Sequence, residues 1–225
     1  TCPTWTTSGK IHSALDFNGT NATVTQAATN LRITGDLTLS VWINVDTVQD
    51  AEYIVHQGEA GSELEADNDL YFLRWDTTSG NDIEYGHENS TGTDNYYVFD
   101  TNLSTGTWYH ITAVRDTTAN TVRLYVNGIQ RPTTYTYTND PTGGSGGEFA
   151  LGSDDNRTAG TFFDGKIDEF KIYSLALTPS EVKLEYNRAS AAVLGSLSTQ
   201  SDGYTATSSA AASGHRFAPG ATHNA

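Results

Sequence analysis

The chain has 225 residues, of which 36% are hydrophobic and 11% aromatic, enough to build one sizeable core. Its formal net charge of −15 argues against nucleic acid or anionic lipid as the direct partner, because both carry negative charge, and it suits neutral sugars and multivalent cations. No apolar run is long enough for membrane insertion, and the single cysteine excludes an internal disulfide. The absence of methionine indicates a mature or excised piece of a longer protein.

Short segments with a hydrophobic residue at every second position recur as far as residue 174. From Leu37 to Val45, for example, every odd-numbered residue is aliphatic. Strands at this density, separated by Gly, Asn and Asp, predict an antiparallel sandwich or barrel. In chain order, the predicted strands are residues 12–18, 22–27, 37–46, 51–58, 69–77, 82–88, 95–101, 107–116, 121–131, 134–138, 147–154 and 163–174.

Three links between these strands have turn chemistry. The Asn127-Gly128 pair favours the positive φ angles of a tight hairpin, and residues 116–120 form a polar link of hairpin length. The Gly19-Thr20 pair predicts a hairpin-like connection between the first two strands.

One helix is predicted, directly after the last strand. Thr178 is a good N-cap, Pro179 suits the first helical position, and Glu181 completes a capping box. After Ala189 the composition changes to Ala, Ser, Thr and Gly, which predicts a tail or linker outside the core.

Five segments in order and at similar spacing carry a family resemblance: ALDFNGTNATV (14–24), LTLSVWINVD (37–46), TWYHITAVRD (107–116), VRLYVNGIQ (122–130) and FDGKIDEFKIYSLALTPSEV (163–182). Together they resemble laminin-G-like, concanavalin A-like jelly-roll domains over residues 12–189. The resemblance implies an all-β fold, a two-sheet antiparallel jelly-roll sandwich with one short C-terminal helix. Residues 1–11 would form an N-terminal lead-in, and residues 190–225 a Ser/Ala/Thr-rich tail or linker.

Members of this family are mostly binding modules for carbohydrate or protein, commonly in extracellular proteins, and many hold calcium. The resemblance therefore implies a non-catalytic, calcium-assisted carbohydrate-binding or adhesion module, extracellular or at the cell surface, with a glycan or a surface protein as partner. An alternative is a structural subunit of a filament, pilus or particle, assembled through the sandwich and the tail by self-assembly or with neighbouring domains. Fold alone does not decide between these functions.

A polysaccharide hydrolase or lyase is a further alternative, since some relatives with this sandwich are enzymes. A glycosidase needs two carboxylates on one side of a sugar cleft, and Asp82, Glu84 and Glu88 share a face of their strand by parity. Their spacing does not match the E-x-D-x-x-E motif of laminarinase-type relatives. We therefore interpret this face as a solvated strand face and predict no catalytic residue.

In the domains that this chain resembles, the first and last strands run close together and can hold a structural calcium ion between them, so the resemblance implies such a site here. By strand parity, Asp168 lies on the same side as Phe170 and Ile172, the core side, where a carboxylate must be paired, hydrogen-bonded or metal-bound. The alternative is a carboxylate that accepts hydrogen bonds from turn amides. The predicted metal site consists of Asp16, Asn18, Gly19 and Asp168.

Two loops and several aromatic residues are further candidates. Sugar binding uses aromatic stacking with a few polar donors, and Arg74 beside Trp75 could supply a charged donor. The alternative for each aromatic residue is ordinary sheet packing, and for each loop a polar surface. The predicted second metal or ligand loop comprises Glu65, Asp67, Asn68, Asp69, Asp154 and Asp155. The predicted carbohydrate-binding residues are Trp75, Tyr85, Tyr96, Tyr97, Tyr135 and Tyr137.

Overall fold

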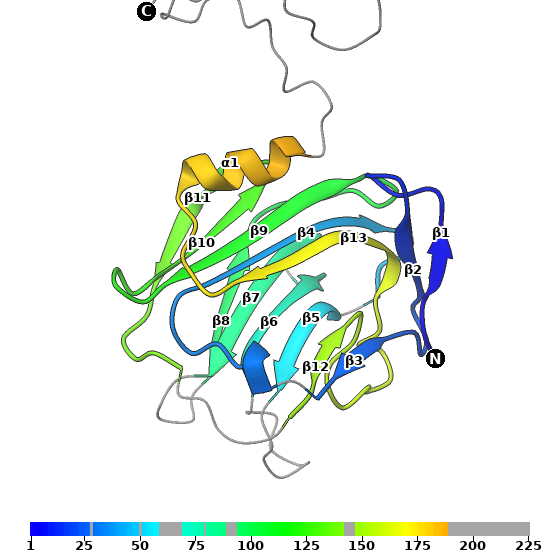
Figure 1. The fold of residues 1–225 in the computed structure, drawn as a ribbon, viewed down its shortest axis with the longest axis horizontal. Coiled ribbons are helices and arrows are strands. Elements are labelled where there is room, and N and C mark those ends of the chain that lie inside the picture. Colours follow the sequence, from blue (N-terminus) through cyan, green and yellow to red (C-terminus); the bar gives the residue numbers. More distant parts are fainter. Residues whose placement is uncertain are drawn as a thin grey trace, which may run out of the picture. The chain divides into compact units, whose positions relative to one another are not determined.

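The computed structural model describes residues 1–27, 29–49, 51–58, 69–78, 80–88, 94–141 and 147–188. They form two antiparallel sheets with one α-helix above the outer face of one sheet (Figure 1). The seven-stranded sheet has the order β1 (Thr4–Thr6), β2 (Ala14–Asn18), β13 (Asp164–Tyr173), β4 (Leu37–Val45), β9 (Tyr109–Asp116), β10 (Thr121–Val126), β11 (Ile129–Thr136). The six-stranded sheet has the order β3 (Val24–Gln26), β12 (Phe149–Leu151), β5 (Glu52–Gly58), β6 (Asp69–Asp76), β7 (Asp82–Glu88), β8 (Asp94–Phe99). A 3₁₀ turn, η1 (Thr29–Leu31), and the helix α1 (Pro179–Arg188) complete the fold.

The first and last strands of the predicted domain lie side by side, because β2 pairs with β13 from Asp164↔Asn18 to Ile167↔Leu15. The predicted hairpin between the first two strands is wrong. β2 pairs with β1 and β13, whereas β3 pairs with β12 in the other sheet, so the turn at Gly19 crosses between the sheets. The lead-in also contributes a strand, since β1 extends the seven-stranded sheet.

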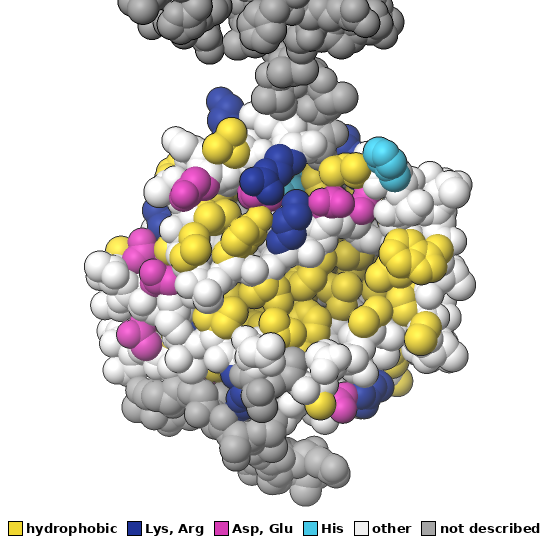
Figure 2. All heavy atoms as spheres, in the orientation of Figure 1, with side chains coloured by type: hydrophobic (Ala, Val, Ile, Leu, Met, Phe, Trp, Pro, Cys, Tyr) yellow, Lys and Arg dark blue, Asp and Glu magenta, His cyan; other side chains and the backbone are white. Residues whose placement is uncertain are grey.

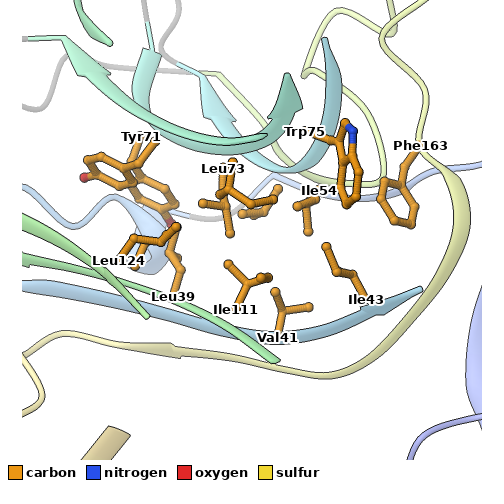
Figure 3. Close-up of a cluster of buried hydrophobic side chains, with 14 of the residues drawn as sticks. Leu39, Val41, Ile43, Ile54, Tyr71, Leu73, Trp75, Ile111, Leu124 and Phe163 are labelled. Carbon is orange, nitrogen blue, oxygen red and sulfur yellow. The ribbon is translucent and has the colours of Figure 1, made fainter. Parts of the chain in front are cut away.

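The core fills the space between the inner faces of the two sheets (Figure 3). Leu39, Val41 and Ile43 of β4 face Leu73 and Trp75 of β6 across this space (Figure 3). All five side chains are fully buried or nearly so, as the alternating pattern of β4 predicts. At roughly 1.5–3 kcal/mol for each large side chain removed from water, this layer is the main stabilising contribution.

The hairpin predicted at Asn127-Gly128 is confirmed as the connection between β10 and β11. Both residues have positive φ angles, 52° and 74°, which Asn and Gly tolerate best. The Asn127 side chain also accepts a hydrogen bond from the His110 amide at 2.9 Å, which ties the turn to β9.

The last strand contains a β-bulge that changes which residues face the core. Its pairing with β4 shifts between Asp168 and Lys171, and Glu169 has a positive φ of 48°. As a result Ile167, before the bulge, and Phe170, after it, both contact the core, while Asp168 lies on the other face opposite Trp42. Simple parity had placed Asp168 on the core side, and the bulge is the physical reason for the difference.

The helix begins where the capping box predicts. The Thr178 amide donates to Glu181 Oε2 at 2.8 Å, and the Glu181 amide donates back to Thr178 Oγ1 at 3.4 Å. Val182 packs with Leu177 against Val114 on the outer face of the seven-stranded sheet, so α1 covers that face.

Hydrophobic side chains also gather on the side of the sandwich shown in Figure 2, over the gap between the two sheets. Partly buried residues at the margin of the core include Leu31, Ile33, Phe170 and Ile172. Of β13, only the first half pairs with β2. In the described part of the chain, the second half, which carries Phe170 and Ile172, has β4 on one side and no neighbouring strand on the other. Within the described residues, no helix is long and apolar enough to span a membrane.

Candidate functional site

The outer face of the six-stranded sheet carries two adjoining rows of side chains from consecutive strands. In one row Tyr53 of β5 pairs with Arg74 of β6, which pairs with Glu84 of β7. In the next row Phe72 pairs with Gly86, which pairs with Tyr96 of β8. Because Tyr71, Leu73 and Trp75 point into the core, Phe72 and Arg74 must point away from it.

Three aromatic rings and one guanidinium form what we call the platform: Tyr53, Phe72, Tyr96 and Arg74. The ring centres of Tyr53 and Tyr96 lie 5.3 and 5.6 Å from that of Phe72. The guanidinium carbon of Arg74 lies 5.5, 5.2 and 5.7 Å from the ring centres of Tyr53, Phe72 and Tyr96. These distances place a cation among three π-systems, an arrangement that stabilises Arg74 in one position. Phe72 is fully buried, whereas Tyr96 is 46% exposed.

The shape of the platform depends on Gly86. A Cβ on Gly86 would overlap the Phe72 ring. This ring occupies the space over β7 that a side chain at position 86 would fill. Glycine in a strand interior weakens it and commonly marks a close approach of another group. Here that group is the ring on which Tyr96 leans.

Arg74 is held by two side chains. Its Nε donates to Glu84 Oε2 at 2.8 Å, Nη2 lies 2.8 Å from the same oxygen, and Nη1 donates to the Tyr53 hydroxyl at 3.2 Å. The side chain of Arg74 is 21% exposed and that of Glu84 only 3%. The contact between the two side chains is therefore shielded from solvent on the Glu84 side and open on the guanidinium side.

Below Arg74, Glu84 and Asp76 form a hydrogen-bonded pair of carboxyl groups. Burial, together with the contact with Asp76, raises the pKa of Glu84 to about 7 against the opposing charge of Arg74. Burial would also raise the pKa of Asp76, but hydrogen bonds from Thr78 and from Glu84 hold it below its usual value. Below about pH 7 the pair therefore holds its proton on Glu84, which then donates to the Asp76 carboxylate.

This arrangement predicts how stability depends on pH. Because the pKa of Glu84 is raised on folding, its contribution to stability is complete below about pH 4.5 and is lost as the pH rises through 7. Glu84→Gln keeps a neutral donor toward Asp76, so we expect its free energy of unfolding to rise relative to wild type between pH 5 and pH 8, by up to roughly 2–3 kcal/mol. Urea unfolding at four pH values measures the difference. Parallel profiles for the two proteins would show that Glu84 is ionised throughout.

A reference for that experiment is Glu52→Gln. Glu52 is fully buried outside the platform, and burial raises its pKa to about 7 as well. We expect the same pH slope for this variant with no effect on the platform, which separates the titration from the site.

One edge of the platform adjoins the loop after β12. The Asp155 amide donates to His56 Nδ1 at 3.1 Å, and His56 stacks on Phe72 with ring centres 6.3 Å apart. The Asp155 carboxylate lies against Gly58, where any Cβ would collide with it. Asp155 thus occupies the rim of the platform, while Asp154 accepts hydrogen bonds from Thr158 and Thr161 within its own loop.

The structure separates the predicted carbohydrate-binding residues. Tyr96 alone among them belongs to the platform and is exposed. Trp75 and Tyr85 are fully buried in the core and Tyr97 and Tyr137 nearly so, which corrects their prediction as a sugar-stacking surface. Tyr135 is partly buried and donates its hydroxyl to the Val98 carbonyl at 2.6 Å.

Sequence reasoning missed Tyr53 and Phe72. Residues 70–73 are hydrophobic at four successive positions, so the strand has no polar face that would mark the outside. The position of Arg74 was the available signal, because an arginine flanked by Leu73 and Trp75 indicates that the even-numbered residues face outward.

The four residues of the predicted calcium site do not come together. Asn18 Oδ1 accepts the amides of residues 20, 21 and 22, and the Gly19 carbonyl accepts from Gln49. Asp168 Oδ2 accepts the Ile11 amide at 2.7 Å, near the other end of β2. Asp16 lies between them, opposite Lys166. The donor set therefore does not fit one calcium ion, and Asp168 matches the alternative of a hydrogen-bonded carboxylate.

Of the second predicted loop, Glu65, Asp67 and Asn68 lie outside the described residues, and Asp69 begins β6. Among the residues that the structure describes, no group of three or more His, Cys, Asp or Glu side chains is placed to hold a metal ion. The strand face that carries Asp82 and Glu84 is buried and not solvated as predicted, because Asp82 accepts the amides of residues 101 and 102 and Glu84 lies under Arg74.

Solved structures with this fold include several carbohydrate-binding domains. Domain 4 of AbnA, an extracellular arabinanase from Geobacillus stearothermophilus in complex with arabinotriose, is 23% identical, with coverage of 83% of this chain and 82% of that chain and a TM-score of 0.61. The CBM40 domain of the Ruminococcus gnavus IT-sialidase, bound to α2,3-sialyllactose, is 14% identical, with coverage of 76% and 95% and a TM-score of 0.63. A putative carbohydrate-binding protein from Bacteroides ovatus is 20% identical, with coverage of 76% and 45% and a TM-score of 0.57.

At these identities the similarity establishes the fold alone. No curated protein sequence matches the chain. The family description "Concanavalin A-like lectin/glucanases superfamily" matches residues 18–183, which is most of the chain and contains both sheets except β1 and all but the last residue of β2. The chain therefore belongs to the concanavalin A-like lectin/glucanase superfamily.

Proposed function

We propose that this protein is a non-catalytic carbohydrate-binding module that binds a glycan on the platform of the six-stranded sheet. The observation that carries the proposal is the cluster of Tyr53, Phe72 and Tyr96 around Arg74, with Tyr96 exposed. Sugars present apolar C–H faces and a rim of hydroxyls, and an aromatic surface with a fixed polar donor complements both. Carbohydrate-binding domains among the structural neighbours support the proposal.

The acid pair argues against glycoside hydrolysis at this face. Hydrolysis of a glycosidic bond needs two carboxyl groups roughly 5–10 Å apart, with the sugar between them. Glu84 and Asp76 are hydrogen-bonded to each other, and Arg74 occupies the other side of Glu84. No sugar fits between two groups in direct contact, so they serve to hold Arg74.

Tyr96→Ala is the direct test of the proposed function. Loss of the exposed ring should weaken glycan binding about tenfold, while thermal stability stays close to that of wild type. Affinity electrophoresis against arabinan, xylan, β-glucan and mannan, followed by calorimetry with the matching oligosaccharide, measures the change. Trp5→Ala is the matched control, because Trp5 is 77% exposed on β1 of the other sheet. Equal affinity of Tyr96→Ala and wild type for every polysaccharide bound would overturn the proposal.

An extracellular or cell-surface location is part of this proposal, in keeping with the extracellular arabinanase among the structural neighbours. Calcium assistance stays a prediction that the described donor groups do not favour. The alternative of a filament or particle subunit rests on the composition of residues 190–225, which lie outside the described part of the chain.

A further inference from the structure

We infer that Arg74 is the specificity-determining residue of the platform and that the ligand is a neutral oligosaccharide of more than one sugar unit, lying along the line from Tyr53 through Arg74 to Tyr96. The inference rests on the proposed function and specifies its ligand class.

The N–H donors of the Arg74 guanidinium are held in one orientation. A guanidinium has five N–H groups in a rigid plane. Glu84 takes the edge formed by Nε and Nη2, and the Tyr53 hydroxyl takes one N–H of Nη1. Within the described part of the chain, no contact uses the remaining donors of Nη1 and Nη2. Arg74 is therefore a partly exposed donor in a fixed orientation, suited to two neighbouring hydroxyl oxygens of a sugar.

The charge of Arg74 is compensated by acidic groups around it. Its positive charge is balanced by the Glu84–Asp76 pair, which carries one negative charge when it shares a proton. Asp155 lies on the rim, and the whole chain has a formal charge of −15. A sugar carboxylate would meet no uncompensated cation here and would be repelled by the surrounding field. A neutral sugar gains the same hydrogen bonds without that repulsion.

The line from Tyr53 through Arg74 to Tyr96 is longer than one sugar ring. Tyr53 and Tyr96 come from strands β5 and β8, with β6 and β7 between them, and their ring centres lie 5.5 and 5.7 Å from the guanidinium carbon of Arg74. One sugar ring covers one of these tyrosines, so contact with both and with Arg74 requires an oligosaccharide. Affinity should therefore rise steeply from monosaccharide to trisaccharide.

The test compares Arg74→Lys with wild type on the neutral polysaccharide that binds best and on polygalacturonate as the acidic probe. Lysine keeps the charge beside Glu84 but loses the planar fork, so we expect neutral glycan binding to weaken ten- to a hundredfold. Wild type should bind polygalacturonate at least tenfold more weakly than the neutral glycan at low salt. Arg123→Lys is the matched control, because Arg123 also pairs with a carboxylate, Asp116 at 3.1 Å, and is 22% exposed.

A second variant guards against loss of folding. Tyr53→Phe keeps the ring and removes only the hydroxyl that receives Nη1, so it should weaken binding about threefold with unchanged stability. Loss of binding in Tyr96→Ala together with full affinity in Arg74→Lys and Tyr53→Phe would overturn this inference and leave the proposed function standing. Polygalacturonate binding as tight as neutral glycan binding would overturn the ligand class. Full affinity in Tyr96→Ala would remove both proposals.

Discussion

Gly165→Ala is expected to be the most destabilising single methyl addition in this domain, lowering the free energy of unfolding by roughly 3–5 kcal/mol. Gly165 has a φ of +150°, a conformation that residues with a Cβ rarely adopt. A Cβ there would also lie 2.9 Å from Val45 Cα and closer still to the Asn44 carbonyl. Both obstacles are backbone atoms of the paired strand β4, which cannot rotate away.

Two other glycines separate the contributions in the same urea-unfolding experiment. Gly106 has a φ of +71° with no atom within 4 Å of a new Cβ, so Gly106→Ala measures the backbone strain alone, about 1 kcal/mol. Gly35 has the same open space without positive φ, and Gly35→Ala should stay within about 0.5 kcal/mol of wild type. If Gly165→Ala were no worse than Gly106→Ala, the close approach of β13 and β4 would be wrong.

Arg115→Met should be the second large effect, a loss of about 3 kcal/mol in the free energy of unfolding. Arg115 is fully buried and donates to the carbonyls of Ile33 and Gly35 at 2.7 and 2.8 Å and to the Tyr85 hydroxyl at 3.2 Å. Methionine fills much of the same space but leaves the buried Tyr85 hydroxyl and the partly buried carbonyls of Ile33 and Gly35 without this donor, and an unsatisfied buried polar group is costly.

The matched control for that measurement is Arg123→Met. Arg123 pairs with Asp116 near the surface, where an ion pair contributes at most about 1 kcal/mol. Chemical denaturation of the three proteins under one condition gives both differences. A loss below 1 kcal/mol for Arg115→Met would mean that water replaces the guanidinium between β9 and the segment of residues 33–35.

Strands with one aliphatic and one polar face were predictable from this alternation. β4 shows this most clearly, since its odd-numbered residues from Leu37 to Val45 all lie in the core. The capping box at Thr178 and the turn at Asn127-Gly128 were predictable because their chemistry is local. What failed was non-local: the turn at Gly19 has hairpin composition, yet its two strands pair with different sheets.

The candidate site was predictable only in part, for the same reason. The adjacency of Tyr96 and Tyr97 predicted that one of the two faces outward, because neighbouring strand residues cannot share a face, but it did not decide which one. Phe72 could be placed only through its neighbour Arg74, because residues 70–73 are all hydrophobic. Tyr53 could not be placed, because the bulge in β5 between Tyr53 and Val55 breaks its alternation. The acid pair depends on the register of β6 against β7, which no single strand reveals.

The bulge in β13 fixes the register of this last strand in the sheet. Its two halves present residues to the core in opposite phase, with Ile167 before the bulge and Phe170 after it. A slip of one residue in either direction would move Asp168 or Glu169 into the core in place of a hydrophobic side chain. Pairing of β13 in a wrong register is therefore unfavourable from either end of the strand. β13 can therefore pair correctly in one register alone, and the bulge at Glu169 fixes that register.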